Sequence, residues 1–443
     1  MRGQKVVIIG GGCAGMAAAY TLKKKGVDFV LLEATDRIGG RVGTGYRDGF
    51  TYAKGAAMTE PQWKTTFNLL SDLNKMSDVE TVDAKVYGFW YKNRISYLPT
   101  GKGASRLAAL KFRGFPFRTV FQLIKFGLHL KKYMKYAGED HDFTGLSEIS
   151  KMSAADFALN FGGPEVVDRI LDPFLATMVL AQAKEVSIAH PIALLSLMQG
   201  MCVVKGGLGS INDGIYETVK DHVRLSTPVN KIVIENKVVK GVETPSGFIE
   251  ADQIICATDA VITRQIIPDL PDSMKNPLET CKYSSTFNYI FAIENRIVPD
   301  DFLSLFIPGS QNSIITSIFD ENASYRQHGP SGTGLMHAFT AGWHDQQLVG
   351  LPEDKRKRLV IKEIQKFYPD FPDEQIFSEC FRYDRAVNLE APGQFIAIQD
   401  LLSNHMKDVK GLYLAGEYLF LIACTEGAWS TGVEAANMAV ADL

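Results

Sequence analysis

The sequence predicts an α/β protein with two domains. A parallel-sheet domain is built from separated parts of the chain, and a second domain of mixed helices and strands is inserted between those parts. Near the start, an apolar run at Val6–Ile9 is followed by three glycines, an alanine-rich helical stretch and a second apolar run that ends at Glu33. Strand and helix patterns of this kind return at about residue 200 and again near the C-terminus. Because 443 residues exceed the usual size of a single core, we expect two domains.

The three glycines of the first unit, Gly10, Gly12 and Gly15, have the GxGxxG spacing between a strand and a helix. The first permits a tight turn, the second lets the backbone approach a pyrophosphate, and the third allows close contact between helix and strand. The helix N-terminus offers amide donors to phosphates, and Glu33 stands where a carboxylate accepts ribose hydroxyls. These residues predict a Rossmann-type dinucleotide site, and a glycine-rich turn of another α/β domain is the alternative.

A second glycine-rich segment, ATDRIGGRVGT, follows Glu33 directly. Gly39 and Gly40 would let the backbone pass close to a cofactor. Arg41 would meet a phosphate with its planar fork of donors. GGR alone is a common turn tripeptide, but its fixed spacing from Gly10, Gly12 and Gly15 indicates a shared cofactor site.

With these residues, the first fifty positions resemble the flavin-containing amine oxidase superfamily, and most of all its protoporphyrinogen oxidase and phytoene desaturase branch. The endings GLYLAGEY and TEGAWSTGVEAA are similar to C-terminal elements of the same family. The resemblance implies FAD as cofactor, held by a Rossmann-type domain with an inserted mixed α+β substrate domain. It further implies FAD contacts from Val229, Glu417, Gly427 and Ala428.

The segment YAKGAAM departs from the family pattern. The family usually has an acidic residue two positions before a glycine, and Ala53 takes that place here. The resemblance still implies that Gly55 to Met58 pass the flavin ring, with Met58 as a contact.

The domain division follows from the order of these patterns. Residues 1–75, 200–265 and 405–443 are expected to form the FAD-binding domain, and residues 76–199 and 266–404 the substrate domain. We expect the stretch from about 80 to 200 to be mostly helical, and a second sheet within about 280 to 400. Short strands are expected around a turn at Asn236 and Lys237.

At two further positions the sequence departs from the amine oxidases of this superfamily, and these positions help to decide which branch of the family it resembles. Amine oxidases of this superfamily carry a flavin-linked lysine on the strand that here reads SSTFNYIFAIE, and Asn288 stands near that place. Cys424 stands where one of two rings that enclose an amine is expected, and it is either a redox partner of the flavin or a small buried side chain. Both departures argue against amine oxidation.

The resemblance therefore predicts an FAD-dependent oxidoreductase that moves a hydride between a carbon centre of an apolar or amphipathic small molecule and flavin N5. The alternatives are an amine oxidase, a non-redox isomerase of the UDP-galactopyranose mutase type and, in another class, a prenyl-protein binding module of the GDP-dissociation-inhibitor type. No pattern of His, Asp or Glu residues indicates a general base, so no catalytic residue is assigned. Arg382, Asp384 and Arg385 offer either an anionic-substrate site or a solvated loop face.

Net charge and composition limit the classes of partner and the cellular location expected for this protein. The net charge of −3 provides no global field for nucleic acid. His337 and His344 lack adjoining metal ligands, so no metal is expected. Six scattered cysteines, no apolar run long enough to span a bilayer and no room for a leader ahead of the first strand predict a cytoplasmic protein with reduced thiols.

Residues 111–135 form a basic amphipathic segment without an acidic residue. Phe117, Phe121, Ile124 and Leu128 follow helical spacing. Three interpretations stay open: peripheral contact with the cytoplasmic face of a membrane, the entrance to an apolar tunnel, or an ordinary helix with a basic solvent face.

Overall fold

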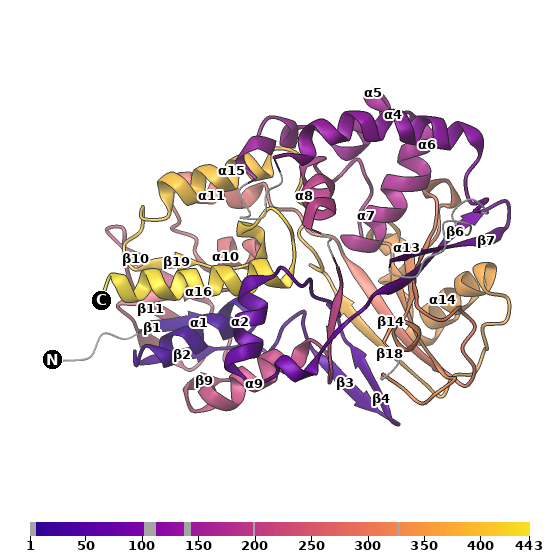
Figure 1. Ribbon diagram of the computed structural model, residues 1–443. Coiled ribbons are helices and arrows are strands. Elements are labelled where there is room, and N and C mark those ends of the chain that lie inside the picture. Colours follow the sequence, from indigo (N-terminus) through magenta and orange to yellow (C-terminus); the bar gives the residue numbers. More distant parts are fainter. Residues whose placement is uncertain (1–5, 102–111, 137–142, 198–199, 326–327) are drawn as a thin grey trace.

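The structure is a computed structural model that describes residues 6–101, 112–136, 143–197, 200–325 and 328–443. Two larger sheets organise the molecule: a five-stranded sheet near the C-terminal helix and a seven-stranded sheet at the opposite end (Figure 1). Gly10 and Glu33, two of the residues expected to bind FAD, directly follow the first and second strands of the five-stranded sheet.

The five-stranded sheet is parallel throughout, in the order β19-β13-β1-β2-β9. Its strands are β1 (Val6–Ile9), β2 (Phe29–Leu32), β9 (Val223–Arg224), β13 (Gln253–Cys256) and β19 (Leu412–Leu414). All but β9 are buried along their length, as expected for a parallel sheet that is covered on both faces. The strands come from three distant parts of the chain, and the boundaries 1–75, 200–265 and 405–443 stay a prediction.

Helices cover both faces of this sheet. One face packs against α1 (Cys13–Lys24), α9 (Gly209–Val219) and α16 (Thr425–Ala441). The other face packs against α10 (Ala260–Ile266), α11 (Asp272–Glu279) and α15 (Gln394–Asp400). This arrangement confirms the expected α/β fold class with a Rossmann-type domain.

A three-stranded antiparallel sheet lies against the second face. It consists of β10 (Lys231–Glu235), β11 (Val238–Thr244) and β12 (Gly247–Glu250). Asn236 and Lys237 connect the first two strands with φ angles of 51° and 61°. Two successive left-handed residues suit a tight hairpin, so the predicted turn is confirmed.

The seven-stranded sheet has the order β18-β14-β17-β16-β15-β6-β7. Its strands are β6 (Ala84–Tyr91), β7 (Arg94–Gly101), β14 (Thr286–Ile293), β15 (Phe302–Phe306), β16 (Ile315–Asp320), β17 (Gly334–Thr340) and β18 (Phe377–Tyr383). Five of these strands lie within the region where a second sheet was predicted. The helix α14 (Glu353–Phe367) packs against it.

The remaining two strands of that sheet correct the prediction of mostly helical structure from about residue 80. Residues 84–101 form a hairpin, and Lys92 and Asn93 make its turn with φ angles of 51° and 55°. The turn residues and the β-branched and aromatic side chains on either side outweigh any helical periodicity.

The helical region begins after this hairpin and covers the upper side of the molecule in Figure 1. It contains α4 (Phe117–Met134), α5 (Ala154–Phe161), α6 (Pro164–Val166), α7 (Asp172–Met178) and α8 (Ala189–Leu197), which share one apolar core. Shorter elements complete the fold: α2 (Lys64–Asp72), α12 (Glu321–Ser324), α13 (Asp345–Leu348), β3 (Thr44–Arg47), β4 (Phe50–Ala53), β5 (Val79–Thr81) and β8 (Cys202–Val204). Within the described part of the chain, no helix is long and apolar enough to cross a bilayer.

The packing of α1 on α16 depends on glycine. A Cβ added at Gly432 would lie 2.1 Å from the carbonyl oxygen of Ala14. The two helices therefore lie closer together here than any residue other than glycine at position 432 allows.

We expect Gly432→Ala to reduce the free energy of unfolding by about 2–4 kcal/mol, because backbone must move to relieve the overlap. Gly127→Ala is the matched control, since a Cβ at this exposed helical position meets nothing within 4 Å. The control should leave stability unchanged or raise it by about 0.5–1 kcal/mol. Urea unfolding measures both, and equal stability of the two variants would contradict the close helix contact.

Candidate functional site

The first glycine turn leaves an open cradle at the N-terminus of α1. A Cβ added at Gly15 would lie 1.8 Å from the carbonyl oxygen of Gly10, and one added at Gly10 would lie 2.8 Å from that of Ala257. Both glycines are therefore required by close backbone contact. At Gly12, by contrast, an added Cβ meets nothing within 4 Å. This empty space in front of a helix N-terminus fits a pyrophosphate.

Glu33 turns its carboxylate back onto this loop. Its Oε2 accepts a hydrogen bond from the Gly11 amide at 2.6 Å, and its Oε1 accepts from the amide and hydroxyl of Thr35, both at 2.8 Å. The Thr227 amide donates to the carbonyl of Glu33 at 2.8 Å, which brings the segment before Val229 alongside. Glu33 and half-buried Val229 thus lie on the side of the glycine turn where the nucleoside is expected.

The second glycine loop lies directly over the first. Gly39 donates to the carbonyl of Gly11 at 2.8 Å, and a Cβ on Gly40, whose φ is 55°, would lie 3.4 Å from the Cα of Gly12. This overlap positions Arg41 at the edge of the cradle.

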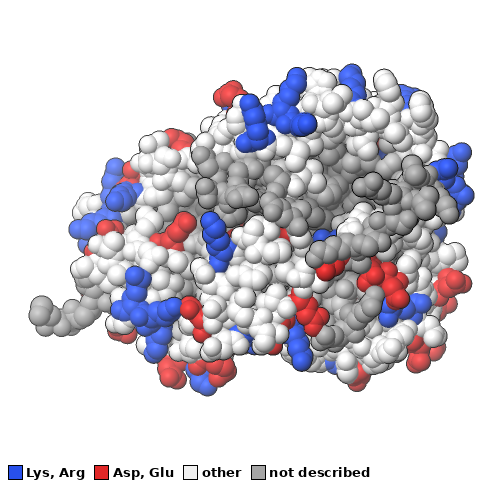
Figure 2. Space-filling view, viewed as in Figure 1, with Lys and Arg blue, Asp and Glu red and all other residues white. Residues whose placement is uncertain are grey.

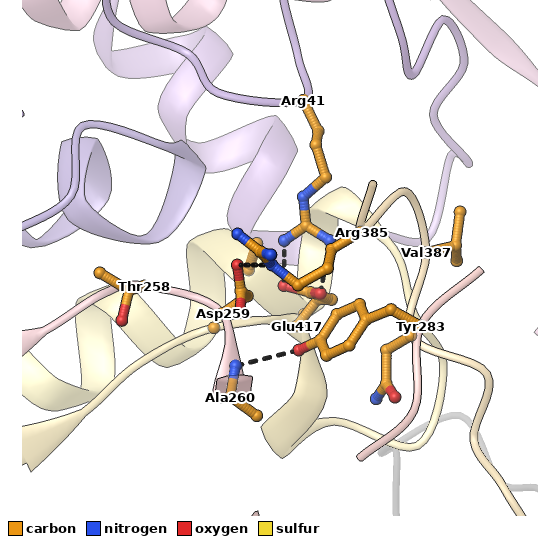
Figure 3. A network of polar contacts seen from close by, with 12 residues as sticks. Arg41, Thr258, Asp259, Ala260, Tyr283, Arg385, Val387 and Glu417 are labelled. Carbon is orange, nitrogen blue, oxygen red and sulfur yellow. Dashed lines mark hydrogen bonds and ion pairs between the residues drawn. The ribbon is translucent and has the colours of Figure 1, made fainter. Parts of the chain in front are cut away.

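Arg41 and Glu417 form a two-pronged ion pair between the beginning and the end of the chain (Figure 3). Nη1 and Nη2 of the arginine donate to Oε1 and Oε2 of the glutamate at 2.7 and 2.6 Å. Burial alone would lower the pKa of Arg41, but the charge and hydrogen bonds of Glu417 outweigh burial and raise that pKa. The sequence predicted that both residues meet FAD, and it did not predict that they bind each other.

Two further contacts in Figure 3 surround this pair. Arg385 donates to Asp259 at 2.8 Å, and the other oxygen of Asp259 caps α10. The hydroxyl of Tyr283 accepts from the Ala260 amide at 3.1 Å. Since Arg385 is engaged by a carboxylate of the protein, its expected alternative role in binding an anionic substrate gains no support.

Arg382 is engaged in the same way. Its two terminal nitrogens donate to Asp345 at 3.0 and 2.7 Å, and its Nε donates to Asp384 at 2.7 Å.

The segment from Ala53 to Met58 crosses from the cofactor side toward the seven-stranded sheet. A Cβ on Gly55 would lie 2.1 Å from the carbonyl oxygen of Arg41, so this segment passes tightly beneath the second glycine loop. The Lys54 carbonyl accepts hydrogen bonds from the Asn288 amide and the Tyr383 hydroxyl, both at 3.0 Å.

Met58 lies half-buried against an apolar group. The buried members of this group, which we call the apolar wall, are Met201, Val203, Leu303, Phe319 and Tyr325. Glu60 follows two residues after Met58, and burial raises the pKa of its carboxyl to about 7.

The N-terminus of α16 is capped by Cys424, whose Sγ accepts from the Gly427 amide at 3.4 Å. The Ala428 amide donates to the Cys424 carbonyl at 3.2 Å. Burial raises the pKa of the Cys424 thiol to about 12, which opposes formation of a reactive thiolate. The next hydroxyl, Thr425 Oγ1, is buried and has no hydrogen-bond partner among the described residues, so it offers a polar group at this helix end. Contacts of Gly427 and Ala428 with flavin stay a prediction.

Sequence reasoning missed two carboxylates that hold this site together. Glu426 accepts the amides of Thr65 and Thr66 at 2.7 and 2.8 Å and so joins the last helix to the first turn of α2. Glu321 accepts from the Ala53 amide at 3.0 Å, beside the position where the family has an acidic residue. Glu426 lies within the quoted EGA element, whereas no local pattern marks Glu321.

Among the residues that the structure describes, no group of three or more His, Cys, Asp or Glu side chains could hold a metal ion. The donor set of the site is instead backbone amides, one guanidinium and carboxylates, arranged around an open glycine cradle. These residues fit a dinucleotide, with Gly12 for the pyrophosphate, Glu33 for the ribose and the segment 55–58 for the ring system.

We expect Arg41→Ala to weaken FAD binding about tenfold to a hundredfold, because it leaves Glu417 buried without its partner and frees the second glycine loop. The FAD affinity of Arg41→Lys should lie between those of the parent protein and Arg41→Ala, since lysine keeps the positive charge but lacks the two parallel donors of a guanidinium. Arg169→Ala is the matched control, because Arg169 pairs with Glu165 at 2.7 Å in the helical region. Quenching of flavin fluorescence gives the dissociation constants. Equal affinities for Arg41→Ala and the control would refute this role.

Comparisons with known proteins agree with this geometry. Residues 13–439 match the family model described as flavin containing amine oxidoreductase. The chain is 25% identical to an L-amino acid oxidase of Cerastes cerastes, covering 94% of this chain and 82% of that protein. It is 22% identical to coproporphyrinogen III oxidase of Bacillus subtilis (strain 168), covering 82% of each. A solved structure of a putative protoporphyrinogen oxidase from Exiguobacterium sp. 255-15 matches with a TM-score of 0.79 and 17% identity over 99% of both chains. The chain therefore belongs to the flavin-containing amine oxidoreductase family and is an FAD-dependent oxidoreductase.

Proposed function

We propose that this enzyme oxidises a carbon centre of an apolar or amphipathic small molecule. FAD supplies the chemistry by accepting the hydride at N5. The residues of the chain bind the cofactor, and those of the apolar wall orient the substrate and exclude water.

The observation that carries this proposal is the apolar wall against Ala57 and Met58. In the segment expected to pass the flavin ring, Ala57 and Met58 pack on buried apolar and aromatic side chains. Such a lining favours a substrate that is recognised by shape and apolar surface. It also excludes water, which strengthens the electrostatic interactions that remain.

Glu60 adds a polar group next to this wall. Its Oε2 accepts the Gly200 amide at 3.1 Å. With its pKa raised to about 7 by burial, the carboxyl is partly protonated at neutral pH and can both accept and donate a hydrogen bond. We propose that it orients a polar end of an otherwise apolar substrate.

Oxidation of an amino acid or amine is the second candidate, and the names of several relatives favour it: L-amino acid oxidase and polyamine oxidase. Two features of this chain oppose it. Asn288, at the place expected for the family lysine, is bonded to the Lys54 carbonyl, and Cys424 caps a helix where an aromatic ring is expected. The described residues give no support to the isomerase or the prenyl-protein binding module considered from the sequence.

The helix α4 supports a further proposal about partners, namely that it docks on an anionic membrane surface. Its inner face is buried through Thr119, Phe126 and Leu130. Four large apolar side chains lie on the opposite face, within about 60° of arc at 100° per residue. These side chains, which we call the α4 ridge, are Phe117 (86% exposed), Phe121 (65%), Ile124 (60%) and Leu128 (66%).

Cations flank the ridge. Arg118, Lys125, Lys131, Lys132 and Lys135 are exposed, and the sequence has no acidic residue between 112 and 136. Figure 2 shows basic side chains along the upper edge of the molecule, where α4 runs in Figure 1. Apolar side chains that enter the acyl boundary, beside lysines that meet anionic headgroups, are typical of interfacial helices. Two copies of the same face would repel each other, which disfavours self-association. Lys111, the first residue of the segment noted in the sequence, lies outside the described residues.

We expect the FAD-loaded enzyme to be bleached under anaerobic conditions by a reduced tetrapyrrole or a polyene precursor faster than by amino acids or polyamines. The apolar wall is the physical reason for this order. Stopped-flow absorbance of the bound flavin measures the rates for one panel of compounds. Faster bleaching by an amine or amino acid would establish the second candidate, and a chain that takes up no FAD would overturn both.

We expect the full-length protein to sediment with vesicles that contain phosphatidylserine and much less with neutral vesicles. Replacing Phe117 and Phe121 together with serine should lower binding at least about tenfold, since each loses apolar surface from the interface. Phe248→Ser is the matched control, because Phe248 is 55% exposed on β12 rather than on α4. Equal binding of all three proteins, or self-association in place of vesicle binding, would count against the membrane proposal.

A further inference from the structure

A chain of buried polar side chains lies behind the segment that is expected to pass the flavin. Asn288 on β14 donates from its amide to the Lys54 carbonyl at 3.0 Å. Its Oδ1 lies 3.2 Å from Nδ1 of His337 on β17, and Nε2 of that histidine lies 2.8 Å from Oε2 of Glu321. All three side chains are at most 1% exposed. The chain therefore runs through the protein interior from the flavin-facing backbone to a carboxylate.

The partners of Asn288 determine its orientation. A backbone carbonyl can only accept a hydrogen bond, so the NH₂ group of Asn288 faces Lys54 and its oxygen faces His337. Because that oxygen is also an acceptor, Nδ1 of His337 must carry a proton. On the other side of the ring, Nε2 faces the carboxyl of Glu321, so one more proton lies between these two groups.

Glu321 is ionised in this arrangement. Burial raises the pKa of its carboxyl, but hydrogen bonds and charge from His328 and His337 outweigh burial and lower that pKa to about 2. The carboxylate also accepts the Ala53 amide at 3.0 Å and Nδ1 of His328 at 3.0 Å. Both ring nitrogens of His337 therefore face acceptor oxygens, Oδ1 of Asn288 and Oε2 of Glu321, which is the arrangement of an imidazolium paired with a carboxylate.

The surroundings of His337 suit a cation. The ring of Phe339 stacks on it with centroids 6.0 Å apart, and the ring of Phe319 lies at 5.5 Å. The titratable groups packed around this cluster include Glu321 on α12, Asp320 at the end of β16, and His328 and Tyr325 in the segment after α12.

We propose that His337 is a buried imidazolium, held by Glu321 and Asn288, whose charge favours the reduced state of the FAD bound against residues 55–58. The proposal rests on the proposed function. A hydride brings two electrons and one proton, so the bound ring system gains one negative charge on reduction. A cation behind the Lys54 carbonyl stabilises that charge, and it acts more strongly than it would in water because the site is buried. His337 and Glu321 are thus positioning residues that do not touch the substrate.

The protonation state of His337 is tested first, on the full-length chain labelled with ¹⁵N-histidine, both without and with FAD. We expect nitrogen shifts typical of two protonated ring nitrogens at neutral pH, assigned by their loss in His337→Gln. His190 is an internal reference, because burial lowers its pKa to about 4 and it should appear neutral. A neutral tautomer at His337 would overturn the proposal whether or not FAD binds.

The effect on the cofactor is tested by redox titration of the holoprotein. His337→Gln should lower the ratio of reduced to oxidised flavin at a fixed potential about tenfold, equal to about 30 mV for a two-electron couple. Glu321→Gln should have the same effect, because it removes the charge that holds the proton, and the double variant should add nothing further. His190→Gln is the matched control and should leave the potential unchanged.

The outcomes separate the two proposals. FAD binding and substrate bleaching with an unchanged potential in His337→Gln would refute the role of the cation alone. Failure to bind FAD would refute the proposed function, while the nitrogen spectra would still decide the charge of His337. If Glu321→Gln fails to fold, the spectra of the parent chain and the potential of His337→Gln still decide the question.

Discussion

The ion pair between Arg41 and Glu417 is the interaction on which the cofactor site depends. It joins the second glycine loop to the short segment after β19, and Arg41 also donates to the Ala386 carbonyl at 3.2 Å. Three segments that are far apart in the sequence therefore meet at one guanidinium (Figure 3). Because Arg41 is fixed in this way, the backbone of Gly55 can pass beneath it and carry Met58 toward the apolar wall.

The free-energy cost of burying the Glu417 carboxylate explains why this ion pair has two parallel hydrogen bonds. The Glu417 side chain is only 8% exposed, so its charge loses most of its hydration, and such a loss is recovered only when hydrogen bonds are well formed. The two parallel bonds to Arg41 meet that condition. Glu321 obeys the same rule with two histidines and a backbone amide. Buried carboxylates thus fix the start of the segment expected to pass the flavin, Glu417 through Arg41 next to Gly55 and Glu321 at Ala53.

Local patterns in the sequence predicted the parts of the site that depend on local geometry. Gly10, Gly15 and Glu33 were identified because a tight turn, a close helix contact and a strand end impose their residue types within one βαβ unit. The pairing of Arg41 with Glu417, the cap that Glu426 provides for α2 and the contact of Glu321 with Ala53 join segments hundreds of residues apart, so no spacing reveals them. The hairpin at residues 84–101 has a local turn at Lys92 and Asn93, but its place in the seven-stranded sheet depends on β15, about two hundred residues later, which no local pattern reveals.

We propose that one FAD lies across the two N-terminal glycine loops and the start of α16, and a crystal structure of the FAD complex is the decisive measurement. We expect the pyrophosphate over Gly12, the adenosine ribose at Glu33, and the flavin ring between residues 55–58 and the N-terminus of α16. A pyrophosphate bound away from Gly12, or a flavin ring out of contact with residues 55–58, would show that FAD does not bind at this site.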